Sequence, residues 1–287
     1  AALIELLRDR RRLIENVVTI QTKKSGILPL HFNSAQQHYW SRRTTRDVIA
    51  KSRQLGFSTL ITAEFLIDAA TIEGLNIYSI WPGEKQSLEH MDAVVMPMYE
   101  RLPEFITIGG REIPFKPRMG LANRTTLTFP DTGSRITVGP AGSIRFARGK
   151  TTHRVHFSEP GFYPPGTFMS LKAAAEGGAP IGTMKTNYGY EAPASRIVWE
   201  STANGRGGDW FDLVSSARYG RTSYALHFYP WMFDSEAFLE EGSLEARAVD
   251  RDIIERVSEE HTFSEMSHAL YSMSITDAQL RYRRAKQ

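Results

Sequence analysis

The sequence predicts an α/β fold built on a largely parallel central sheet with helices against its faces. Two observations lead to this prediction. Short segments rich in β-branched and aromatic residues recur along the chain, and segments of helical periodicity separate them. The stretch Ser58–Ala70 contains no glycine or proline and spaces its apolar residues for one buried helical face. This alternation is typical of βαβ units, in which ligands bind at the carboxyl ends of the strands.

The elements can be assigned in chain order. We expect an amphipathic surface helix over Ala1–Ile20, because charged residues interrupt its apolar positions. The helix Ser58–Ala70 follows the first strand of the core. The expected strands are Val48–Ala50, Asn76–Trp81, Thr125–Phe129, Arg135–Val138, Val155–Phe157 and Ile197–Trp199.

The predicted organisation has three parts. Residues 1–30 form an N-terminal helix or lid segment, residues 31–217 form the core, and residues 218–287 form a smaller lid or linker subdomain. Between Asp234 and Glu260, ten acidic residues stand against three basic ones, which indicates a separate, solvated helical region.

Composition narrows the class of protein. The chain has 287 residues, 41% of them hydrophobic, so it can bury a substantial core. It has no cysteine, which excludes disulfide scaffolds and thiolate metal sites and fits a reducing setting such as the cytoplasm. No segment reaches the roughly 18 apolar residues that a spanning helix needs, so we expect no membrane association.

The charge distribution is only mildly basic. A formal charge of +3 and a pI near 9.0 do not by themselves establish nucleic-acid binding. Two basic clusters stand out, and each is either a solvated face or a DNA contact. They are Arg42, Arg43, Arg46, Lys51 and Arg53 before the first core helix, and Arg281, Arg283, Arg284 and Lys286 at the C-terminal end.

The segment Lys51–Thr59 lies between a predicted strand and a predicted helix, where a phosphate-binding loop belongs. Compared with the pattern G-x-x-x-x-G-K-[ST], Gly56 and Ser58 match, but Phe57 occupies the lysine position. The phosphates need a cation, and Lys51 at the start of the loop can supply it. Ser58 is the candidate magnesium ligand. The loop residues expected to hold nucleotide are Lys51, Arg53, Gln54, Gly56, Phe57, Ser58 and Thr59.

Two further residues complete the candidate nucleotide site. Gln36 lies upstream of the loop, and its amide could read the donor and acceptor edge of adenine. Asn204 lies in the polar loop Ser201–Gly205 after the strand Ile197–Trp199, where it can contact the γ-phosphate or relay its loss. The alternative for this loop is a simple turn.

A second strand end carries the expected catalytic carboxylate. The strand Val155–Phe157 runs into Ser158 and Glu159. An ATPase places its magnesium-side and water-activating groups at such a strand end. Glu159 would polarise the attacking water. Ser158 stands where an aspartate usually supports magnesium, and it would act on the metal through a water. The alternative is an ordinary surface strand end with one glutamate.

These segments together, from Leu28 to Trp231, resemble the ATPase motor domain of the large terminase subunits of tailed bacteriophages, which has a P-loop NTPase core of the ASCE type. Lys51 resembles the lysine at the start of that family's deviant Walker A loop. Ser158 and Glu159 resemble the Walker B end, Ser201–Gly205 the coupling motif, and Gln36 the Q-motif. The departure lies at Ser158, which brings no charge to the magnesium shell.

The resemblance also implies an arginine that stabilises the transition state. In that family, an arginine just before the Walker B strand can act in the neighbouring subunit's site. Arg148 best matches that place, and Arg145 is the alternative. A solvated loop arginine or a DNA-phosphate contact is the other interpretation of Arg148.

The resemblance implies a function and partners. The protein would hydrolyse ATP with Mg²⁺ to translocate viral double-stranded DNA into the procapsid, in the host cytoplasm. It would assemble as a homo-oligomeric ring on the portal protein and work with a small terminase subunit. Nuclease activity is expected only in a full-length protein, because Thr276–Arg284 resembles the link before the nuclease domain. Two alternatives stay open: a helicase-like nucleic-acid-dependent ATPase, and a nucleotide-binding structural subunit without hydrolysis.

Overall fold

The computed structural model describes residues 2–22, 25–143, 150–186, 188–234, 268, 271 and 275–286. The chain divides into two compact units. The first unit comprises Ala1–Ser52 and Gly56–Phe228, and the second comprises Arg53–Leu55 and Tyr229–Gln287.

A seven-stranded sheet forms the centre of the first unit, with the order β13-β3-β12-β9-β4-β8-β7. Its strands are β3 (Arg46–Lys51), β4 (Asn76–Trp81), β7 (Thr126–Phe129), β8 (Ser134–Pro140), β9 (Arg154–Ser158), β12 (Arg196–Ser201) and β13 (Ala225–Tyr229). The strands from β3 to β8 in this order are parallel, and β7 pairs antiparallel with β8. The predicted α/β fold is therefore confirmed, with every expected strand present. β13 extends the sheet past residue 217, where we expected the core to end.

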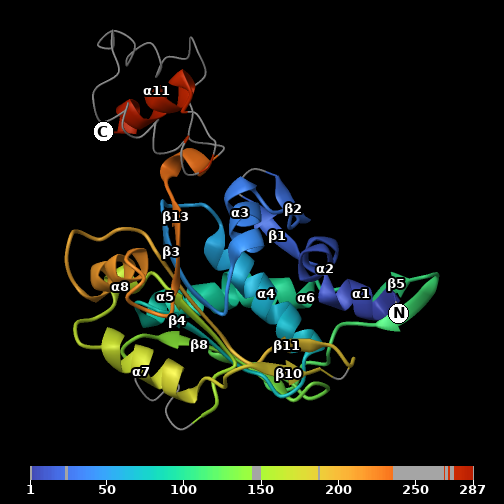
Figure 1. Ribbon diagram of the computed structural model, residues 1–287. Helices are drawn as coiled ribbons and strands as arrows, with labels where there is room; N and C mark the ends of the chain where they lie inside the picture. Colours follow the sequence, from blue (N-terminus) through green and yellow to red (C-terminus); the bar gives the residue numbers. More distant parts are fainter. Residues whose placement is uncertain are drawn as a thin grey trace. The chain divides into compact units, whose positions relative to one another are not determined.

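Helices cover both faces of this sheet (Figure 1). They are α4 (Phe57–Thr71), α5 (Glu84–His90), α7 (Phe168–Gly178) and α8 (Asp209–Arg218). On one face, Phe157 and Trp199 stack with ring centroids 3.6 Å apart and pack against α7 and α8. Side chains alternate along a strand, so the next residue in each strand faces α4. The side chains of His156, Ser158 and Glu200 therefore lie on that second face, toward α4.

Shorter elements surround the sheet. The remaining helices of the first unit are α1 (Ala2–Arg8), α2 (Arg10–Val17), α3 (Ser34–Arg42), a π-helical turn over Met91–Val95, α6 (Met96–Glu100) and a 3₁₀ turn over Pro160–Phe162. Three antiparallel hairpins pair β1 (Thr19–Thr22) with β2 (Gly26–Pro29), β5 (Phe105–Ile108) with β6 (Arg111–Pro114), and β10 (Thr183–Lys185) with β11 (Glu191–Pro193).

The N-terminal segment differs from the single helix expected over Ala1–Ile20. The helix breaks at Asp9, whose side chain accepts a hydrogen bond from the backbone nitrogen of Arg12 and so caps the start of α2. The last two residues of the expected helix, Thr19 and Ile20, belong to strand β1. The prediction of one continuous helix was wrong because a local cap and a β-branched pair compete with the helical pattern.

A buried ion cluster ties α4 to its neighbours. Asp68 on α4 pairs with Arg10 of α2, and its Oδ2 atom accepts a 2.6 Å bond from Nε of Arg154 on β9. Burial raises the pKa of Asp68, but the two guanidinium groups outweigh it and hold the pKa below its ordinary value. The cluster fixes α4 against the strand that carries the candidate catalytic carboxylate.

The described part of the second unit is small. It contains a 3₁₀ turn over Trp231–Phe233 and the helix α11 (Asp277–Lys286). Tyr271 stacks on Tyr229 and meets Phe233 edge-on, and the side chain of Gln279 donates to the carbonyl of Met232 at 3.0 Å. The expected acidic helical region lies almost entirely outside the described residues. Throughout the described residues, helices long and apolar enough to cross a bilayer are absent.

Candidate active site

Three strand ends meet at the carboxyl edge of the sheet. β3 ends at Lys51, β9 ends at Ser158, and β12 ends at Ser201. β12 lies between the other two, and its Glu200 is directly in register with Ser158. The topology therefore places the candidate phosphate-binding lysine, the Walker B-like end and the polar loop after β12 side by side.

The loop after β3 leads into α4 through Gly56, which is left-handed with φ +71° and ψ +19°. The side chain of Gln36 donates to the carbonyl of Gly56 at 2.9 Å, and a Cβ at Gly56 would meet that Nε2 atom at 2.8 Å. Glycine is thus favoured here by its backbone angles, and a Cβ would displace the Gln36 amide. The α4 N-terminus that follows carries the positive end of a helix dipole, which favours phosphate.

Lys51 lies between two carboxylates. Its Nζ atom is 3.0 Å from Oε1 of Glu159 and 3.1 Å from Oε2 of Glu200, and 7% of its side chain is exposed. Burial lowers the pKa of Lys51, but the charges of Glu200 and Glu159 outweigh it, so the pKa is raised above its usual value. The lysine is charged at neutral pH and is held at the edge of the sheet, where an anionic ligand would meet it.

Glu159 is held in an unusual conformation. Its backbone is left-handed, with φ +50° and ψ +48°, which is uncommon for a residue with a side chain. Its Oε2 atom accepts a 3.0 Å bond from the backbone nitrogen of Thr202, and the Ser201 hydroxyl lies 3.0 Å away. The loop after β12 therefore orients the Glu159 carboxylate directly, while 26% of the side chain stays exposed to water.

Glu200 is the central carboxylate of the site, and sequence reasoning missed it. Its side chain is fully buried, and its Oε1 atom accepts bonds of 2.7 Å from Ser58 and 2.7 Å from Ser158. Nε2 of His156 lies 3.1 Å from the same oxygen. Burial raises the pKa of Glu200, but Lys51 and the hydrogen bonds from His156 and Ser58 lower it to about 2. The usable signal was a charged residue at the end of an otherwise apolar strand.

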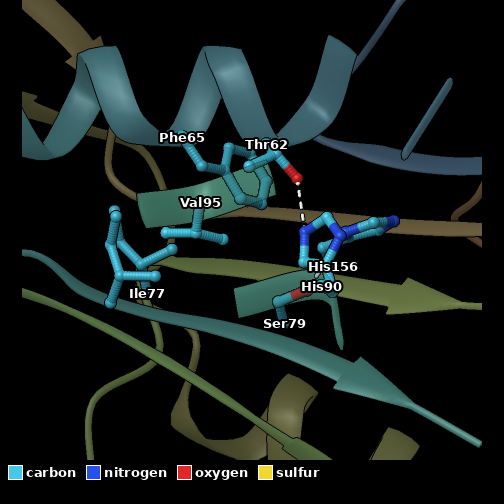
Figure 2. Close-up of a pocket in the computed structure, with 8 residues that line it drawn as sticks. Thr62, Phe65, Ile77, Ser79, His90, Val95 and His156 are labelled. Carbon is cyan, nitrogen blue, oxygen red and sulfur yellow. Dashed lines mark hydrogen bonds between the residues drawn. The ribbon is translucent and has the colours of Figure 1, made fainter. Parts of the chain in front are cut away.

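A small pocket lies under the site, between α4 and the sheet. Figure 2 shows Thr62 of α4 facing an imidazole there, and Nε2 of His90 lies 2.9 Å from the Thr62 hydroxyl. His156 lines the same pocket, and its Nδ1 atom lies 3.3 Å from the hydroxyl of Ser79. Burial lowers the pKa of His90 to about 3, so this imidazole is neutral at physiological pH.

Three other residues expected to contact nucleotide instead make contacts within the protein. Both polar ends of the Gln36 amide are engaged within the chain, since Oε1 accepts from the backbone of Asn33, instead of facing outward for adenine. Phe57 is 1% exposed and packs edge-on against Tyr39, so it belongs to the core. Asn204 donates to the carbonyl of Gly161 at 2.7 Å, within the loop that follows Glu159.

The remaining predicted site residues do not contact Lys51, Glu159 or Glu200 in any bond described above. Arg53 and Gln54 are exposed, Gln54 with φ +66°, and Thr59 is half-buried on α4. Arg43, from the first basic cluster, is not a free surface charge, because its guanidinium covers the Trp40 ring at 3.3 Å and lies 3.4 Å from Glu64. Arg148 and Arg145 lie outside the described residues.

Comparisons with known proteins gave structural likenesses only. No protein-family model matches this chain, and no curated protein matches it. The ATPase domain of the Thermus phage P74-26 large terminase aligns with 90% of this chain and 92% of its own, at 15% identity and a TM-score of 0.48. The large terminase from a thermophilic bacteriophage aligns with 76% of this chain at 12% identity and a TM-score of 0.49.

Another structure of this second terminase, in complex with ADP, aligns with 76% of the present chain at 12% identity and a TM-score of 0.48. The present chain covers 50% of the terminase chain in the first of these two structures and 49% in the second, so it spans about half of that protein's length.

Proposed function

We propose that this chain is an ATPase motor of the large terminase type, which hydrolyses ATP to drive viral double-stranded DNA into a procapsid. The observation that carries the proposal is the position of Lys51, whose ammonium lies within 3.1 Å of two carboxylates at the carboxyl edge of a parallel sheet. A cation, a helix N-terminus and an oriented carboxylate at one edge are the parts that phosphoryl transfer requires.

Lys51 serves as the phosphate-binding cation in place of the lysine that Phe57 replaces. The loop that starts at Lys51 ends in Gly56 and the N-terminus of α4, so phosphate oxygens bound there face both the ammonium and the helix dipole. Binding of ATP would exchange the carboxylate partners of Lys51 for phosphate oxygens.

Glu159 orients the attacking water. It is the more exposed of the two carboxylates, with 26% of its side chain accessible against 0% for Glu200. Thr202 and Ser201 hold its Oε2 atom, so a change in the loop after β12 moves the carboxylate. This contact gives the loop a physical means of coupling catalysis to motion.

The donor set of the site fits magnesium. Its oxygens come from Ser58, Ser158 and Glu200, and each of the two hydroxyls donates to Oε1 of Glu200 at 2.7 Å. Magnesium prefers oxygen ligands and combines one or two carboxylates with waters and substrate phosphates. Ser58 would ligate it, and Ser158 would act through a water. Magnesium held by these residues would offset the negative charge of the phosphates.

The packaging role and the partners belong to the same proposal. They are double-stranded DNA, the portal protein, a small terminase subunit and further copies of this chain in a ring, in the cytoplasm of the host. Arg148, or Arg145 as the alternative, would stabilise the transition state in the neighbouring copy. Gln36 and Asn204 would contact nucleotide after rearranging from the bonds described above.

The function is tested by measuring ATP binding and hydrolysis in the same preparation, with and without Glu159→Gln. The amide keeps the shape of the side chain but has no negative charge with which to polarise the attacking water. We therefore expect binding to persist and turnover to fall by about 10²-fold or more. Glu89→Gln is the matched control. This glutamate lies on α5, is 63% exposed and pairs with Lys85.

The outcomes separate the competing functions. Binding without hydrolysis in the wild-type protein would favour a structural nucleotide-binding subunit, and absence of both would contradict the proposal. Hydrolysis stimulated by single-stranded but not double-stranded DNA would favour a helicase-like ATPase. Equal turnover in the Glu159→Gln and Glu89→Gln variants would remove Glu159 from catalysis.

A further inference from the structure

The strand end beside Glu159 lacks a carboxylate, but the structure supplies one from the neighbouring strand. Ser158 and Glu200 are register partners on β9 and β12, and Glu200 points to the same side of the sheet as Ser158. The carboxylate thus lies against the position where the sequence has only a hydroxyl. No residue pattern in β9 itself reveals this arrangement.

The hydrogen-bond directions around Glu200 are fixed by chemistry. An ionised carboxylate can only accept, so the hydroxyls of Ser58 and Ser158 both donate to its Oε1 atom at 2.7 Å. Each hydroxyl has a single hydrogen. The lone pairs of Ser58 are therefore directed away from Glu200 and remain available to a cation.

His156 holds Glu200 in this position. The indole of Trp81 can only donate, and it donates to the Ser79 hydroxyl at 2.9 Å. The same hydroxyl lies 3.3 Å from Nδ1 of His156, and Nε2 of that ring donates to Glu200 at 3.1 Å, because an ionised carboxylate can only accept. The buried imidazole of His156 is thus held between Ser79 and Glu200, and it orients the carboxylate.

From this geometry we infer that Glu200 is the positioning residue of the magnesium site, supplying the negative charge that Ser158 cannot and directing the Ser58 hydroxyl toward the metal. The inference rests on the proposed nucleotide-binding function and deepens it. The negative charge of the metal site then comes from Glu200 on β12. Ser158 helps to hold Glu200 in place through its hydrogen bond.

The test is the magnesium dependence of nucleotide binding, measured without turnover. The dissociation constant of ATP-γ-S is determined in EDTA and in a magnesium titration, and their ratio reports the contribution of the metal. In Glu200→Gln, we expect this ratio to fall by about tenfold or more, as is typical for the loss of an outer-shell partner. Affinity in EDTA should stay equal or rise, because a negative charge near the phosphates is removed. A folding defect would weaken both.

Two further variants keep the test decisive even if Glu200→Gln is unstable. Glu89→Gln removes an exposed carboxylate that pairs with Lys85 on α5, and it should leave the ratio at the wild-type value. The double variant Ser158→Asp with Glu200→Gln returns the carboxylate to β9 and should recover most of the ratio. Thermal melting and circular dichroism establish that each variant is folded.

The inference is overturned by a folded Glu200→Gln protein with the wild-type ratio, or by a Glu89→Gln protein that loses the ratio as strongly as Glu200→Gln does. Either result leaves the proposed function standing if the wild-type protein still binds and hydrolyses ATP. Failure of the wild-type protein to bind ATP-γ-S with magnesium would overturn both.

Discussion

The Nζ atom of Lys51 lies 3.0 Å from Oε1 of Glu159, although 108 positions separate the two residues in the sequence. The contact exists because β3 and β9 flank β12 and end at the same edge of the sheet. It neutralises part of the carboxylate charge before a ligand arrives. Removing the lysine would therefore leave two carboxylates without their shared cation, as well as removing charge from the phosphate site.

Lys51→Ala should lower ATP affinity or turnover by about 10²-fold, because a preorganised charge is lost at the phosphates. The control is Phe57→Leu, at the position where the usual motif has its lysine. That residue is 1% exposed in the core, and a conservative change should cost stability without touching nucleotide. Isothermal titration with ATP-γ-S and steady-state ATPase assays measure both effects. Equal, small losses in the two variants would contradict the role of Lys51.

Ser201→Ala should lower kcat about tenfold while leaving ATP-γ-S affinity unchanged, because the hydroxyl lies against Oε2 of Glu159, away from the lysine. The backbone bond from Thr202 remains, so the loss should be smaller than in Glu159→Gln. Ser41→Ala, at an exposed residue of α3, is the matched control. A change in affinity with unchanged kcat would indicate that Ser201 contacts nucleotide instead.

The sequence predicted the sheet well because buried parallel strands read as compact apolar runs. It also singled out Lys51 and Ser58 at the loop between β3 and α4 and Glu159 after β9, and the structure places Lys51 against Glu159. It could not find Glu200, because the role of that residue depends on which strand lies beside β9. Strand order is a tertiary property that local patterns do not encode.

The same reason explains two differences at the site. Gln36 is suited to reading adenine by its amide, but a capping box with Asn33 and the carbonyl of Gly56 use both of its ends. The predicted core ended at residue 217 and so did not include β13, because the sequence of a short strand at the edge of a sheet resembles that of a loop.

Acid should destabilise the first unit through Asp68. Its pKa is lowered in the folded protein, so its contribution to the free energy of unfolding is full above the unfolded pKa of about 4 and is lost as pH falls through the folded pKa. Asp68→Asn should therefore lower stability at pH 7 and flatten the decline of stability below about pH 4. Urea denaturation at a series of pH values measures this. A mutant with the same acid dependence as the wild type would assign the transition to other carboxylates.

Gly56→Ala should destabilise the protein more than Gly26→Ala, although both glycines have nearly the same backbone conformation. Their φ angles are +71° and +75°, so an alanine at either position carries the cost of a left-handed residue, about 1 kcal/mol. Among the residues that the structure describes, a Cβ at Gly26 meets no atom within 4 Å, whereas at Gly56 it meets Nε2 of Gln36 at 2.8 Å. The difference between the two variants measures this close approach.

Replacing Gln36 as well separates the steric part from the backbone part. In a Gln36→Ala background, the cost of Gly56→Ala should fall toward that of Gly26→Ala, because the clashing amide is gone while the left-handed φ remains. Unfolding free energies from urea titrations of the four proteins close this double-mutant cycle, with Gly26→Ala measured beside them. Additive costs, with Gly56→Ala equally damaging in both backgrounds, would show that the Gln36 amide moves aside without cost and that the damage comes from the left-handed backbone alone.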